Sequence, residues 1–249
     1  MRYGVEAAEP GGRRVGVVAS FDFTRRAELS RWVPPEVTCA LAFTRRVAYE
    51  DNWQLVSRLS RPGVLTEPLG ELRRTAGGLP EAVAYLCTAC SFADGVDGEA
   101  ALREEMAAQG VRQALTTSGA VTAALRAVGA RRVAVVHPYQ APVDRYLAGY
   151  LEATGFEVAG RTALGLDAVD DVYGVRTGQV GDAVAAGDRP GADAVFISCT
   201  ALPTYDVIPA LEDRLGKPVI SANQATVWAL LRAVGSRARG SGQRLLEHC

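Results

Sequence analysis

The sequence offers little of the side-chain chemistry on which many enzymes depend. Its only lysine is Lys217 and its only histidines are His137 and His248, so arginine carries almost all basic charge. Schiff-base chemistry with pyridoxal phosphate needs a lysine. Lys217 stands in "RLGKPVI", where the pattern predicts a surface turn between a helix and a strand. A Ser-His-Asp site would have to use His137 in every role. The sequence therefore offers few residues for either Schiff-base chemistry or Ser-His-Asp catalysis.

Long apolar runs and basic stretches are also missing. No run of about 18 or more apolar residues is present to span a membrane, and "MRYGVEAAEPGGRR" lacks the apolar middle of a signal peptide. The net charge is −1, without the basic stripe that nucleic acid requires. We therefore expect a cytoplasmic protein that binds neither membrane nor nucleic acid.

Cysteine is sparse and odd in number: Cys39, Cys87, Cys90, Cys199 and Cys249. In a reducing cytoplasm this pattern favours free thiols over a disulfide framework. Cys39 is interpreted as a buried strand residue and Cys249 as a thiol of the C-terminal tail.

What the chain does contain is an alternation of short β-branched runs and longer Ala- and Leu-rich stretches. Continuously apolar strands alternating with helices predict parallel sheets covered on both faces. The predicted strands are 14–19, 37–43, 82–87, 112–117, 132–136, 156–159, 193–198 and 218–221. The predicted helices are 22–31, 51–60, 99–108, 119–128, 142–154, 172–186, 204–214 and 223–234. Residues 61–80 are expected to be irregular, with room for one short helix.

Two pairs of similar segments indicate an internal duplication. "RRVGVVASF" at 13–21 matches "RRVAVVHPY" at 131–139, and both "EAVAYLCTA" and "DAVFISCTA" end an apolar run in Cys-Thr-Ala. The pairs occur in the same order and at nearly equal spacing. We therefore predict an α/β fold of two pseudo-symmetric lobes, each a short parallel sheet flanked by helices, with the active site in the cleft between them. Residues 1–115, completed by a helix at about 223–235, form the first lobe, 116–222 form the second, and 236–249 form a flexible tail.

The paired motif places one thiol from each lobe at a strand end, where ligands bind in such sheets. Cys87 and Cys199 would then face one cleft, which suits acid, base or nucleophilic chemistry on two sides of a small group. Nearby hydroxyl, phenol and amide groups fit a carboxylate substrate: Thr88, Thr117, Ser118, Tyr139, Thr200 and Asn223. Each of the residues Thr117, Ser118 and Asn223 is equally explained as a helix cap.

With these motifs the chain resembles the aspartate/glutamate racemase superfamily, in its branch of maleate cis-trans isomerases and arylmalonate decarboxylases. The resemblance covers about residues 13–235, and its most specific segments are "AYLCTACSF", "GARRVAVVHPY" and "DAVFISCTALPTYDVIPALEDRLGKPVISANQA". It implies catalysis without a metal or an organic cofactor, on a small carboxylate. Cys87 would attack a double bond as thiolate, and Cys199 would supply or remove the proton. Tyr139 would be the substrate-binding tyrosine. Since members of the superfamily often form dimers, the resemblance is also consistent with a homodimer.

The resemblance also bears on the reaction. Arylmalonate decarboxylases lack the first cysteine and keep the second, so the presence of both favours an isomerase of the maleate isomerase type. Decarboxylation of a substituted malonate, with Cys199 as proton donor, and amino-acid racemisation remain alternatives. A protein that binds its ligand without turnover remains a third.

Two departures from the family pattern concern the site. Asp22, in "ASFDFT", stands near the place of the family's substrate-contacting Asn, and an ionised carboxylate there would repel a dianion. Either Asp22 points away, or it is protonated, or the substrate carries another group such as an amine. Cys90 stands where a small residue is common, and it makes Cys87-Thr-Ala-Cys90 a C-x-x-C motif. Such a motif is also consistent with a redox pair or with half of a zinc site.

Overall fold

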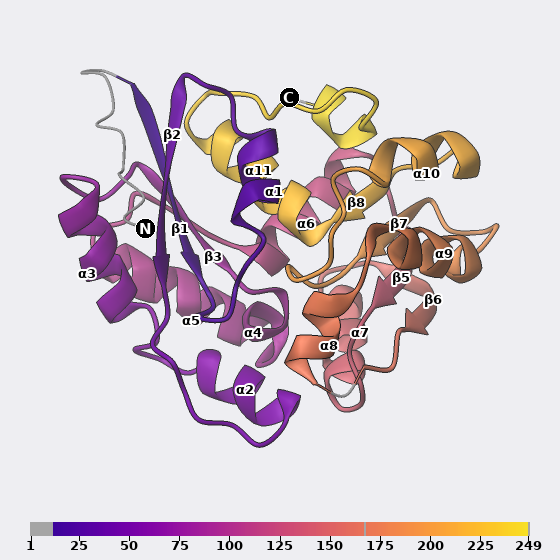
Figure 1. The fold of residues 1–249 in the computed structure, drawn as a ribbon, viewed down its shortest axis with the longest axis horizontal. Coiled ribbons are helices and arrows are strands. Elements are labelled where there is room, and N and C mark those ends of the chain that lie inside the picture. Colours follow the sequence, from indigo (N-terminus) through magenta and orange to yellow (C-terminus); the bar gives the residue numbers. More distant parts are fainter. Residues whose placement is uncertain (1–11, 167, 249) are drawn as a thin grey trace.

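The computed structural model describes residues 12–166 and 168–248, and these fold as two similar α/β halves (Figure 1). The strands are β1 (Arg13–Ala19), β2 (Val37–Phe43), β3 (Ala82–Leu86), β4 (Gln113–Thr116), β5 (Arg132–His137), β6 (Glu157–Ala163), β7 (Ala194–Ile197) and β8 (Val219–Ser221). The helices of the first half are α1 (Arg26–Trp32), α2 (Asn52–Leu59), α3 (Thr66–Thr75), α4 (Thr88–Phe92), α5 (Gly95–Ala108) and α6 (Thr117–Ala127). Those that follow are α7 (Val143–Ala153), α8 (Val169–Gly174), α9 (Thr177–Gly187), α10 (Ile208–Leu215), α11 (Ala222–Ala233) and the 3-10 helix η1 (Arg244–Glu247).

Each half contains one parallel sheet, and the two sheets have equivalent strand orders. The first runs β2-β1-β3-β4 and the second runs β6-β5-β7-β8. The duplicated segments thus occupy equivalent places, since β1 and β5 carry the Arg-Arg-Val motif while β3 and β7 precede Cys-Thr-Ala. Every residue of β3 and β7 is buried, as their uninterrupted apolar sequences predict. The predicted two-lobed α/β fold is confirmed.

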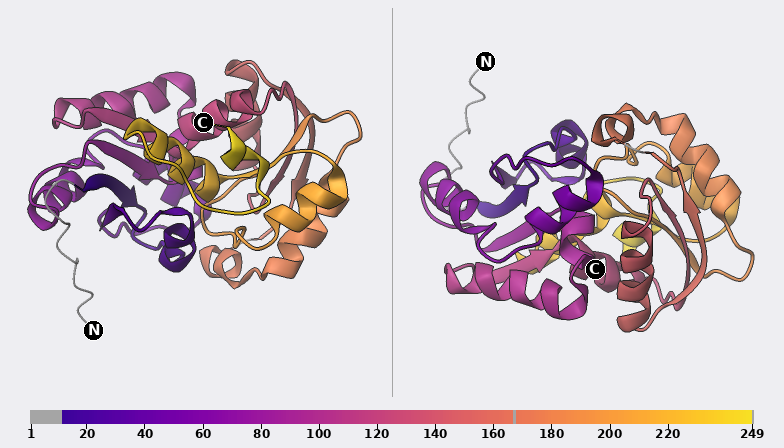
Figure 2. Two further views of the ribbon diagram at one scale, coloured as in Figure 1. Left: turned by 90° about the horizontal axis from the view of Figure 1, so that it is seen from above. Right: turned by 90° about the horizontal axis from the view of Figure 1, so that it is seen from below.

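Helices α6 and α11 follow the last strand of each sheet and join the two halves. Their starts are fixed by equivalent caps, because Thr116 Oγ1 accepts the N–H of Gly119 at 3.0 Å and Ser221 Oγ accepts that of Gln224 at 3.2 Å. The two helices pack on each other, and α11 also contacts β3 and β4 of the first sheet. The halves lie side by side in both views of Figure 2. Apolar side chains of both sheets and of α11 share one continuous core.

The structure corrects the expectation of a flexible tail over 236–249 for the residues that it describes. Leu245 is fully buried, and Gln243 Oε1 accepts hydrogen bonds from Trp32 Nε1 at 2.8 Å and Gln224 Nε2 at 2.9 Å. Gly and Arg content suggested mobility, but one leucine and one glutamine fix the segment to α1 and α11. Cys249 lies outside the described residues, as does the start of the expected first lobe, residues 1–11.

Helix boundaries differ from the predicted ones mainly where helices are short. Helix α3 lies inside the 61–80 segment, and α8 takes the start of the helix predicted at 172–186. Helix α4 begins directly after Cys87 and was not predicted. In the described part of the chain, no helix has both the length and the apolar character needed to cross a membrane.

Candidate active site

A cavity of about 390 Å³ lies between the two halves, at the carboxyl ends of four strands. Residues after β1, β3, β5 and β7 line it, which is where parallel sheets bind ligands. The lining comprises Ser20, Asp22, Asp51, Asn52, Trp53, Leu55, Val56, Leu59, Cys87, Thr88, Ala89, Cys90, Pro138, Tyr139, Gln140, Ala141, Pro142, Val143, Val169, Val172, Tyr173, Cys199, Thr200 and Ala201. Both predicted catalytic cysteines, one from each half, therefore border the same space.

Cys87 caps the short helix α4 directly after β3. Its Sγ accepts the backbone N–H of Cys90 at 3.4 Å. The two residues are also joined by a disulfide, so the expectation of free thiols is wrong for this pair. Three-residue spacing across the first turn of a helix brings the two sulfur atoms together, a proximity that cysteine counting does not capture. Cys39 and Cys199 are free among the described cysteines.

Cys199 occupies an unusual backbone conformation just after β7. Its φ angle is 102°, and among the described non-glycine residues it is the one with positive φ. L-residues rarely adopt this region, so the surrounding packing must hold it there. The backbone N–H groups of Ala201 and Leu202 and the hydroxyl of Tyr139 lie near the thiol. These donors favour the thiolate, but burial outweighs them and raises the pKa of Cys199 to about 11. Near neutral pH, Cys199 is therefore a thiol that can donate a proton.

Tyr139 is held rigidly beside Cys199. Its ring stacks on His137 with 5.4 Å between ring centroids and meets Phe92 edge-on at 5.9 Å, while its hydroxyl lies 3.2 Å from Ser198 Oγ. Burial raises the pKa of Tyr139 well above its ordinary value. The phenol therefore stays protonated and can donate a hydrogen bond to Cys199 or to a ligand.

Asp22 also lines the cavity, with its side chain half-buried and hydrogen-bonded by the Ser20 hydroxyl. Its negative charge opposes ionisation of Cys199 and of Tyr173. Asp22 thus stands close enough to the cavity to influence its ionisable groups.

Three predicted binding residues lie behind the cavity wall instead of in its lining. Thr117 donates to the carbonyl of Tyr85, Ser118 lies 2.7 Å from the hydroxyl of Ser91, and Asn223 Nδ2 donates to the carbonyl of Thr200. All three are buried. They bond to the backbone of β3 and of the residues that follow Cys87 and Cys199, whereas the predicted residues Thr88 and Thr200 do border the cavity.

Sequence reasoning missed the apolar wall of the site. Helix α2 contributes Trp53, Leu55 and Val56, and helix α8 contributes Val172 and Tyr173. An amphipathic helix was predicted at 51–60, but an apolar face gives no signal of whether it covers a core or a ligand. Among the described residues, no group of three or more His, Cys, Asp and Glu side chains is placed to hold a metal ion.

Comparison with known proteins confirms the resemblance that the motifs suggested. The sequence profile of the arylmalonate decarboxylase family, Amdase, matches residues 69–246. An arylmalonate decarboxylase of Bordetella bronchiseptica is 35% identical over 159 residues, which are 63% of this chain and 66% of that protein. The alignment thus spans slightly less than two thirds of that relative.

Solved structures of maleate isomerases share the whole fold. That of the isomerase Iso from Pseudomonas putida S16 has a TM-score of 0.81 and 25% identity, over 94% of this chain and 98% of that one. That of a Nocardia farcinica maleate cis-trans isomerase variant, with a covalently bound succinylcysteine intermediate, has a TM-score of 0.73 and 27% identity, over 95% and 98%. With a family profile that spans most of its length, this chain belongs to the arylmalonate decarboxylase family, whose fold maleate isomerases share.

Proposed function

We propose that this protein is a cofactor-independent isomerase of a small carboxylate, which acts through Cys87 and Cys199. The observation that carries the proposal is the convergence of these two cysteines, from equivalent strand ends of the two halves, on one cavity. The covalent succinylcysteine of the Nocardia farcinica relative supports nucleophilic use of a cysteine in this fold. We keep the prediction of a cytoplasmic location, where cellular thiols would reduce the Cys87–Cys90 disulfide.

The maleate-type reaction divides naturally between the two thiols. The reduced Cys87 thiolate adds to one alkene carbon, forming a C–S bond as the π bond breaks, and Cys199 gives its proton to the other carbon. Rotation then occurs about the new C–C single bond. The Cys199 thiolate removes a proton from that carbon, the double bond re-forms, and Cys87 leaves as thiolate. The raised pKa of Cys199 suits the donor role, because the proton must be present at neutral pH.

Decarboxylation of a substituted malonate is the second candidate, and the disulfide is the observation that favours it. While Cys87 is bonded to Cys90, Cys199 is the free thiol of the lining. One thiol is sufficient to protonate the carbanion left when CO₂ departs. Racemisation, in which the two thiols exchange a proton at one carbon, uses the same pair as isomerisation.

Proton NMR in D₂O tests these reactions. Reduced protein is incubated separately with maleate, aspartate, glutamate and phenylmalonate. We expect an isomerisation product, fumarate from maleate or deuterium at the α-carbon of an amino acid, which Cys87→Ser and Cys199→Ser each abolish. Loss of a carboxyl group from phenylmalonate that survives in Cys87→Ser but not in Cys199→Ser would instead assign the decarboxylase.

A further inference from the structure

The residues that follow Cys199 in the second half are held by side chains of the first half. Glu28 lies on α1, and its Oε1 accepts the backbone N–H of Thr204 at 2.9 Å and the hydroxyl of Thr204 at 2.8 Å. The backbone N–H of Tyr205 also donates to this oxygen, at 3.3 Å. One carboxylate oxygen of the first half thus accepts three hydrogen bonds from a single segment of the second.

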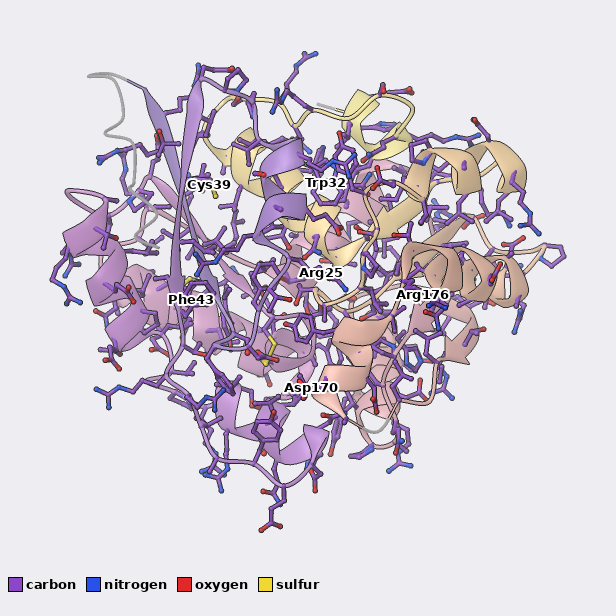
Figure 3. The ribbon with its side chains drawn as sticks, viewed as in Figure 1. Arg25, Trp32, Cys39, Phe43, Asp170 and Arg176 are labelled. Atoms are coloured by element: carbon purple, nitrogen blue, oxygen red, sulfur yellow. A yellow bond between two sulfur atoms is a disulfide. The ribbon has the colours of Figure 1, made fainter. Side chains whose placement is uncertain are left out.

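Arg25, directly before α1, makes a second set of contacts between the halves. Its Nε donates to the carbonyl of Ala201 at 2.8 Å, and its Nη2 donates to the carbonyl of Tyr173 at 2.9 Å. Ala201 and Tyr173 border the cavity, whereas neither Arg25 nor Glu28 belongs to the described lining. Figure 3 shows Arg25 at the junction of the two halves. Because a guanidinium presents its N–H groups as a rigid fork, Arg25 fixes these two carbonyls relative to each other.

The segment after Cys199 has to be held, because the φ angle of 102° at Cys199 is strained. Residues 199–202 form a turn, in which the N–H of Leu202 donates to the carbonyl of Cys199 at 3.4 Å. The N–H groups of Ala201 and Leu202 also lie near the Cys199 thiol, where they favour its thiolate. The bonds to Ala201 and Thr204 therefore fasten the backbone that carries these donors.

We propose that Arg25 and Glu28 are positioning residues for Cys199, although they belong to the other half of the molecule. They keep the turn after Cys199 closed, and the closed turn keeps the N–H groups of Ala201 and Leu202 beside the sulfur atom. The inference rests on the proposed function, in which Cys199 gives up a proton and takes it back. Whenever the proton is on the substrate, these N–H groups stabilise the Cys199 thiolate.

Arg31 separates two roles, joining the halves and positioning the thiol. It also lies on α1 and bonds to the same segment, because its Nη1 and Nη2 donate to the carboxylate of Asp206 at 2.7 Å and 2.6 Å. Asp206 follows Thr204 and lies outside the described cavity lining. Contacts that only join the halves would act alike at Arg25, Glu28 and Arg31, whereas contacts that position the thiol would not include Arg31.

Alkylation of Cys199 by iodoacetamide at pH 9 tests the inference on the reduced protein, because the rate measures the thiolate. Arg25→Lys keeps the charge but cannot reach both carbonyls, and Glu28→Ala removes the acceptor. We expect the Cys199 peptide to react at least about fivefold more slowly in each variant, since an opened turn withdraws donors from the thiolate. Glu28→Gln retains an oxygen acceptor and should recover most of the rate. No variant changes Tyr139 or Asp22, which also influence the pKa of Cys199.

Two matched variants and one internal reference serve as controls. Arg31→Gln removes a bond between the halves, and Asp213→Asn removes one exposed negative charge on α10, outside the described lining. Both should react at the rate of the unchanged protein. Cys39, a free cysteine of β2, reports general opening of the fold in the same digests, and its rate should stay constant in all variants.

Three results would overturn the inference: unchanged rates in Arg25→Lys and Glu28→Ala, faster reaction in these variants, or equal slowing by Arg31→Gln. Faster reaction would mean that the contacts only cover the thiol. Because alkylation needs no substrate, it is independent of the reaction tested by NMR. Slower alkylation in both variants, without turnover of any of the four compounds, would support the positioning role and contradict the isomerase. Isomerase turnover with unchanged alkylation in both variants would support the isomerase and contradict the positioning role.

Discussion

At the scale of single residues, Cys199 combines a strained backbone, three stabilising donors and an opposing carboxylate. Burial is the largest influence and raises its pKa to about 11, while the charge of Asp22 adds to the rise. Alkylation by iodoacetamide requires the thiolate, so its rate at Cys199 should rise about tenfold per pH unit from pH 7 to 10 without levelling. Mass spectrometry of the Cys199 peptide measures this rate.

Asp22→Asn provides the internal comparison for this titration. Removing the negative charge lowers the pKa of Cys199, so the variant should react faster than the unchanged protein at each pH. Asp213→Asn is the matched control and should follow the unchanged protein. A plateau of the rate near pH 9 would show an ordinary thiol and contradict the assignment of Cys199 as a protonated donor.

The disulfide leads to a second prediction at this scale, because Cys87 cannot attack a substrate while it is bonded to Cys90. Dithiothreitol would form its own cyclic disulfide and leave both protein sulfurs as thiols. We expect isomerase turnover to rise at least tenfold on its addition. Cys90→Ala, which cannot form the bond, should be active with or without reductant.

Cys39→Ala serves as the control for Cys90→Ala, since Cys39 is a free cysteine of β2 outside the cavity lining. It should keep the dependence on dithiothreitol. If Cys90→Ala still required the reductant, the disulfide would not be what limits Cys87.

At the scale of elements, α2 and α7 contact each other beside the cavity. Trp53 of α2 stacks on Tyr146 of α7 with 4.7 Å between ring centroids and 7° between planes. Trp53 and, at the start of α7, Val143 both line the cavity. Aromatic pairs of this kind contribute about 0.5–1.5 kcal/mol beyond their burial. A double-mutant cycle with Trp53→Leu and Tyr146→Leu should give that coupling in urea unfolding.

The same cycle with Trp53→Leu and Asp213→Asn is the control, because α10 contributes nothing to the cavity lining. Its two free-energy changes should add within about 0.5 kcal/mol. A coupling below about 0.5 kcal/mol for Trp53 and Tyr146 as well would mean that the stack does not hold α2 against α7.

The elements also show what sequence alone could supply. Each of the eight strands in the described residues overlaps a predicted one, and uninterrupted apolar runs such as Ala82–Leu86 are typical of strands in a covered sheet. Helix α4 was missed because five residues, Thr88–Phe92, are too few to show a helical period. Strand ends placed Cys87, Cys199 and Tyr139 beside one cavity, and the family resemblance pointed to Asp22, which also borders it. The spacing of residues could not reveal which hydroxyls and amides would donate to the backbone behind the cavity, as Thr117 Oγ1 and Asn223 Nδ2 do.

At the scale of the whole molecule, the C-terminal segment connects parts of both halves. Gln243 bonds to Trp32 of α1 and to Gln224 of α11, and Glu212 of α10 accepts the backbone N–H of Arg244 at 2.8 Å. Leu245 is fully buried within the cluster that contains Trp228 and Ile220. A segment bonded to both halves should make them unfold together, so we expect one cooperative transition in urea.

Leu245→Ala tests this role of the segment. Removing a fully buried leucine side chain costs the transfer free energy of the lost methyl groups plus that of the cavity, about 2–5 kcal/mol. We expect a loss in that range with the transition still single, measured by urea unfolding followed through tryptophan fluorescence and circular dichroism. Leu246→Ala is the matched control, and because Leu246 is only partly buried its loss should be smaller. A loss below about 0.5 kcal/mol for Leu245→Ala would contradict the docked segment, and two separate transitions would contradict the shared core of the two halves.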